Sequence, residues 1–73
     1  MTEQVNVAKA IRFLRVQKGM SARAVSTAAG LSPSYVSKVE SGDLDPSFKA
    51  FCALAEVLKM TDAEIVFLVR LKT

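Results

Sequence analysis

Apolar residues recur at steps of three and four along almost the whole chain, the spacing that places them on one face of an α-helix. In the stretch 5–18 the recurring positions are Val7, Ala8, Ile11 and Leu14. No segment shows the strict alternation of apolar and polar residues that is typical of a half-buried strand. The pattern therefore predicts an all-α chain.

Glycines and capping residues divide this pattern into five short helices, the last of which runs to about residue 71. Gly19 ends the first helix and Gly30 the second. From the second helix onward, each helix is preceded or opened by a hydroxyl residue that can accept a hydrogen bond from a free amide: Ser21, Ser32, Ser47 and Thr61. Pro33 then stands at the first position of the third helix, where a missing N–H costs nothing. Residues 1–73 are thus expected to form one compact five-helix domain.

The third and fourth helices each have a distinct apolar face. In the third, which ends near Ser41, Val36 and Val39 face the expected core, while small hydroxyls and the amine of Lys38 point away from it. The face of the fourth is formed by Phe48, Phe51, Leu54, Ala55 and Leu58. Cys52 lies within that helix and is expected to be an inert small hydrophobic residue.

The apolar residues of the fifth helix surround its axis instead of forming one stripe. A monomer of 73 residues has no second layer to cover them, so we expect a homodimer. The expected interface consists of Ile65, Val66, Phe67, Val69 and Arg70. The alternative is that this helix folds back over Phe51 and Leu58 and completes the core of a monomer.

Composition excludes several classes of site and protein. With one cysteine and no histidine, the chain has neither an internal disulfide nor a ligand set for structural zinc, and we expect no metal or cofactor. No uninterrupted apolar run, that of 65–69 included, approaches the roughly 20 residues of a membrane span. The polar N-terminus lacks the apolar region of a signal peptide, so we expect a cytoplasmic protein. Glu40, Asp43 and Asp45 have no histidine or phosphate loop beside them, and we expect no enzyme.

Charge is distributed unevenly along the chain. Up to residue 39 there are six basic residues against one acid, whereas residues 40–73 carry four basic residues against six acids. The basic half also contains the serine-rich third helix. This asymmetry is a hint of a polyanionic partner such as nucleic acid.

The second and third helices, joined by a short turn with Gly30, have the arrangement of a helix-turn-helix over about 22–41. Ser26 stands where the two helices touch and a small residue is needed. The chain resembles the Cro/repressor-like (Xre-type) helix-turn-helix family of phage and bacterial regulators. The residues that carry the resemblance are Leu14-Arg15, Gly19-Met20-Ser21, Gly30-Leu31-Ser32, 34–40, Gly42, Pro46-Ser47, and Leu54-Ala55 with Leu58.

The resemblance implies a lambda-repressor-like fold whose third helix lies in the major groove of double-stranded DNA. It also implies an ion pair between Arg15 and Glu40. The DNA-contacting residues carried over from the family are Arg23, Ser32, Pro33, Ser34, Tyr35, Ser37, Lys38 and Ser41. Tyr35 would reach a phosphate. The chain departs from the family at Ala22, where glutamine is usual, and Arg23 is expected to supply a phosphate contact in its place.

The function implied by the resemblance is sequence-specific regulation of transcription. We expect a repressor that binds an inverted-repeat operator as a homodimer, with a contact to RNA polymerase or a regulatory partner left open. The alternative is a protein-interaction module of the same fold, such as an antitoxin or antirepressor adaptor. Salt-dependent retention on duplex DNA would distinguish the two.

Overall fold

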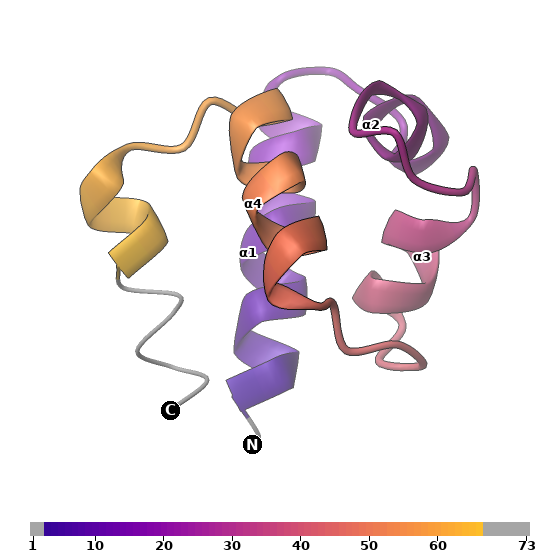
Figure 1. The fold of residues 1–73 in the computed structure, drawn as a ribbon, viewed down its shortest axis with the longest axis horizontal. Coiled ribbons are helices and arrows are strands. Elements are labelled where there is room, and N and C mark those ends of the chain that lie inside the picture. The colour runs from indigo at the N-terminus through magenta and orange to yellow at the C-terminus, as the bar shows by residue number, and fades with distance from the viewer. Residues whose placement is uncertain (1–2, 67–73) are drawn as a thin grey trace.

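The computed structural model describes residues 3–66 and is helical, with no strand in that range. The helices are α1 (Glu3–Gln17), α2 (Ala22–Ala28), α3 (Tyr35–Glu40) and α4 (Phe48–Val57), and residues 62–66 form a further helical segment. Helix α4 lies in front of α1, with α2 and α3 on one side of this pair and the segment 62–66 on the other (Figure 1). The predicted all-α fold is confirmed.

The core lies between the four helices. Its buried apolar residues are Val7 and Ile11 of α1, Val25 of α2, Val36 and Val39 of α3, and Phe51, Leu54 and Leu58 at α4. These are positions that the helical spacing predicts. Each short helix buries too little surface to be stable alone, so α2 and α3 owe their stability to this shared core.

The apolar face of α4 was predicted incorrectly at its beginning. Phe48 is 72% exposed, and Ala50 is buried instead. Phe48 is the first residue of the helix and lies off the stripe that continues through Phe51 and Leu54. Cys52 is also exposed, and it lines a surface hollow together with Met60 and Ile65.

Three of the predicted caps are present. The Ser21 and Ser47 hydroxyls accept hydrogen bonds from the amides of Ala24 and Ala50, at 3.0 and 3.1 Å. Thr61 and Glu64 form a reciprocal capping box, with bonds of 2.8 and 3.2 Å. These caps confirm the predicted starts of α2, α4 and the segment 62–66.

Lys59 follows α4 in the left-handed conformation, with φ of 54°. The amides of Lys59 and Met60 donate to the carbonyls of Glu56 and Ala55, an arrangement in which glycine is usual. We expect Lys59→Gly to raise the free energy of unfolding by about 0.5–1 kcal/mol, because a side chain strains this conformation. Urea denaturation measures the change. Lys59→Ala keeps the Cβ atom and serves as the control; equal stability of the two variants would contradict the explanation.

Candidate nucleic-acid interface

The turn between α2 and α3 is held by backbone hydrogen bonds. Gly30, with φ of 74°, takes the left-handed conformation and its amide donates to the Thr27 carbonyl at 3.0 Å. The next amide, of Leu31, donates to the Ser26 carbonyl at 2.9 Å. The chain thereby reverses direction within a few residues and brings α3 against α2, as a helix-turn-helix requires.

Helix α3 begins later than predicted. Ser32 is not its N-cap and Pro33 is not its first residue, because the helix starts at Tyr35. The Tyr35 amide donates to the Ser32 carbonyl at 3.0 Å, which closes a turn with Pro33 and Ser34 at its centre. The fixed φ of proline suits the second position of such a turn, and Ser34, with φ of −97° and ψ of 3°, has the backbone of its third position.

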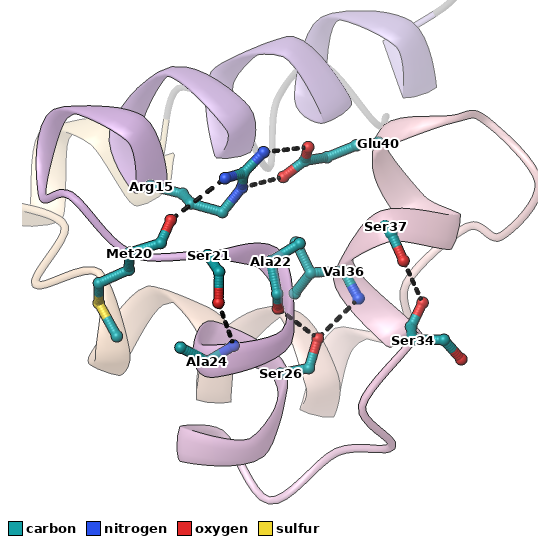
Figure 2. Close-up of polar contacts among 10 residues, drawn as sticks. All are labelled: Arg15, Met20, Ser21, Ala22, Ala24, Ser26, Ser34, Val36, Ser37 and Glu40. Atoms are coloured by element: carbon teal, nitrogen blue, oxygen red, sulfur yellow. Dashed lines mark hydrogen bonds and ion pairs between the residues drawn. The ribbon is translucent and has the colours of Figure 1, made fainter.

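Ser26 of α2 supplies the side-chain cap that α3 lacks locally. The Ser34 side chain caps no amide among the described residues. The Val36 amide donates instead to the Ser26 hydroxyl at 2.9 Å, and that hydroxyl donates to the Ala22 carbonyl at 2.8 Å (Figure 2). The side chain is fully buried. Sequence reasoning assigned Ser26 only its small size; the signal for more was a hydroxyl at a position where alanine or glycine would also fit.

Arg15 and Glu40 join the C-terminal ends of α1 and α3 through a bidentate ion pair. The Nε and Nη2 atoms of Arg15 donate to the two carboxylate oxygens of Glu40 at 2.7 and 2.8 Å, and Nη1 donates to the Met20 carbonyl at 3.1 Å (Figure 2). The two side chains are only 16% and 10% exposed. The hydrogen bonds to Glu40 are the main reason that the pKa of Arg15 is raised above its usual value, despite desolvation that lowers it.

The outer face of the motif is formed by small hydroxyls and two basic residues. Tyr35 is half-buried and packs against the core, and the other predicted DNA-contacting residues are exposed: Arg23, Ser32, Pro33, Ser34, Ser37, Lys38 and Ser41. The Ser37 hydroxyl donates to the Ser34 carbonyl at 3.0 Å, which leaves its oxygen able to accept a hydrogen bond. Ser41 lies at the far end of α3, and its hydroxyl is 3.0 Å from the Asp43 carboxylate.

This face can approach a polar, crowded surface closely. Small hydroxyls exchange hydrogen bonds with base edges and phosphates, and the long side chains of Arg23 and Lys38 can reach phosphate oxygens from a distance.

No group of acidic and cysteine side chains in the described part of the chain could hold a metal ion. None of the described helices combines the length and apolar character of a membrane span.

The predicted dimer residues fall only partly within the structure. Ile65 is half-buried and packs against the core, whereas Val66 is exposed. Phe67, Val69 and Arg70 lie outside the described residues. The sequence pattern missed an exposed apolar pair on α1, Phe13 and Val16, which lie one helical turn apart.

The family resemblance is tested by a direct comparison. A helix-turn-helix family model, HTH_3, matches residues 11–65, which are most of the chain and contain α2, α3 and α4 entirely. Comparison with curated proteins and with solved structures gives no significant match. The matched region includes Arg15, Ser26 and Glu40, the residues that hold α3 in place. The chain therefore belongs to the helix-turn-helix family of DNA-binding domains, of the Cro/C1 type.

Proposed function

We propose that the chain is a sequence-specific regulator of transcription that inserts α3 into the major groove of double-stranded DNA. The observation that carries the proposal is the exposed face of α3, with Ser34, Ser37 and Lys38. The opposite side of this helix is fixed by the Ser26 hydrogen bond at its N-terminal end and by the Arg15–Glu40 ion pair at its C-terminal end. Membership of a DNA-binding family that is generally not enzymatic supports it.

Contacts to phosphates would supply most of the affinity for DNA, and contacts to bases would supply the selectivity for one sequence. Arg23 and Lys38 are exposed on α2 and α3, beside the hydroxyls, and their charge suits the phosphates that border the groove. Serines form single hydrogen bonds to bases and lack the bidentate geometry of arginine, asparagine or glutamine. The shape and deformability of the operator therefore contribute to the proposed specificity.

Repression is the output that we propose, because a domain bound across a promoter blocks it without any further surface. The acidic loop containing Asp43 and Asp45 is exposed and leaves a contact with RNA polymerase open as a second output. The proposed location is the cytoplasm, where such a protein meets its DNA.

Selection from a random duplex library tests the proposal. The wild-type protein is expected to enrich a defined motif, and the logarithm of its affinity is expected to fall linearly with the logarithm of salt concentration as counterions are released. Retention of no duplex at low salt, by protein that is folded by circular dichroism, would contradict DNA binding. That outcome would favour the alternative function, a protein-interaction module of the same fold.

We further propose that the protein binds an inverted repeat as a homodimer, with two recognition helices about 34 Å apart. The proposed interface is the C-terminal helix, where Val66 is exposed and apolar residues continue in the sequence. In sedimentation from micromolar concentration upward, we expect the wild type to dimerise and Phe67→Lys to remain a folded monomer. Unfolding of the variant would place Phe67 in the core and the interface elsewhere. A wild-type monomer at every concentration would limit pairing to the DNA-bound state.

A further inference from the structure

We infer that Ser26 is a positioning residue for sequence-specific recognition: its buried hydroxyl sets the N-terminal end of α3 against the DNA bases. The inference rests on the proposed function, since it concerns how α3 is held while it reads DNA. It assigns Ser26 a role that its small size alone does not provide. Alanine would satisfy the need for close packing of α2 and α3 equally well.

Ser26 holds both ends of the connection between the two helices. Its carbonyl accepts the Leu31 amide at the end of the turn, and its hydroxyl accepts the Val36 amide in the first turn of α3, both at 2.9 Å. The hydroxyl proton is used by the Ala22 carbonyl, so the oxygen presents a lone pair to α3. Because Ser26 is fully buried, water cannot take over this contact without a structural change.

The geometry predicts that loss of the Ser26 hydrogen bond lowers the sequence specificity of DNA binding while the domain stays folded. Helix α3 has six residues and is attached to the domain at its far end by the ion pair between Glu40 and Arg15. Loss of the Ser26 bond would leave that attachment and the valine contacts in place, and would loosen the backbone at the N-terminal end, which lies nearest the bases in this docking mode. Hydrogen bonds to base edges tolerate little displacement, whereas the flexible side chain of Lys38 can follow a phosphate.

The test measures binding to two duplexes of equal length, one enriched by the wild type from a random library and one unrelated. We expect Ser26→Ala to lower the ratio of the two affinities by about tenfold and to leave the salt dependence of non-specific binding unchanged. Ser26→Cys places a slightly larger thiol, which is a weaker acceptor, where the hydroxyl was, so its ratio is expected to lie between those of Ser26→Ala and the wild type.

Thr27→Ala is the matched control. Thr27 is adjacent and exposed, and its hydroxyl bonds only to the carbonyls of its own helix, at Arg23 and Ala24, in the described structure. Its ratio is expected to equal that of the wild type. The folded fraction of every variant is measured by circular dichroism at the temperature of the binding assay.

Three results would overturn the inference while the proposed function stands. These are an unchanged ratio in folded Ser26→Ala, an equal loss of affinity for both duplexes, and loss of folding in both Ser26→Ala and Ser26→Cys. If only Ser26→Ala fails to fold, the ratio for Ser26→Cys decides, and a wild-type value overturns the inference. A wild type that binds neither duplex overturns the proposed function, and the inference with it.

Discussion

Glutamate in place of Ser34 or Ser37 is expected to abolish binding to duplex DNA, with a loss of affinity of at least about 100-fold. The face of α3 that we propose for the major groove would then carry a carboxylate among phosphates and base acceptors, and like charges brought together in an interface cost several kcal/mol. Electrophoretic mobility shift with the enriched duplex measures the loss.

The fold should survive both substitutions. Ser34 and Ser37 are exposed, and the Ser37 hydroxyl bonds only to the Ser34 carbonyl within the described structure. Glutamate at residue 34 even lies at the N-terminus of α3, where a negative charge is favourable. Helical circular dichroism is therefore expected to match that of the wild type.

Ala63→Glu is the control for the change in net charge. Ala63 is exposed in the segment 62–66, which lies across α1 and α4 from α3 (Figure 1). Its affinity for the duplex should fall only slightly where sedimentation shows the oligomeric state of the wild type, because the segment belongs to the helix proposed for dimerisation, whereas the added charge is distant from the proposed DNA-contacting face and is screened by salt. Wild-type affinity in both Ser34→Glu and Ser37→Glu would show that α3 does not face DNA.

Glu40→Ala is expected to lower the free energy of unfolding by about 3 kcal/mol, since it leaves the Arg15 guanidinium largely buried without its counterion. Arg15 would lose two hydrogen bonds of 2.7 and 2.8 Å and keep the one to the Met20 carbonyl. For a domain of this size the melting temperature should fall by roughly 12–24 °C. Thermal and urea denaturation measure both quantities.

Removal of both charges provides the matched comparison. The double variant Arg15→Met with Glu40→Leu should recover most of the lost stability, because no unpaired charge remains in the interior and the apolar side chains fill similar space. Glu40→Ala within about 0.5 kcal/mol of the wild type would instead class the pair with exposed salt bridges, which contribute little. Weaker DNA binding than the wild type by a stable double variant would indicate that the pair also orients α3.

Local patterns in the sequence determined most of the fold. The helical spacing identified most of the buried residues of the four helices, including Val25, Val36 and Val39. The caps at Ser21, Ser47 and Thr61 were also predictable, since each hydroxyl accepts from an amide three residues ahead in the same segment. These features depend on spacing within one helix, which the sequence displays directly.

The resemblance supplied what spacing could not. Arg15 and Glu40 are 25 residues apart, and nothing in the local sequence pairs them. The exposed face of α3 followed from its pattern, but its direction toward DNA came from the family. Phe48 shows the limit of periodicity at a helix end, where one residue can lie on either side of the boundary of the core.

The beginning of α3 was decided by tertiary structure alone. A local reading places the cap at Ser32, because serine before proline is a strong start signal, yet the helix begins at Tyr35. The amide that needs a cap, that of Val36, finds it ten residues earlier on another helix, in the Ser26 hydroxyl. The sequence determined where helices can form, through contacts within a few residues. Only packing of α2 against α3 could bring that distant hydroxyl within hydrogen-bond distance, and it thereby determined how α3 is held.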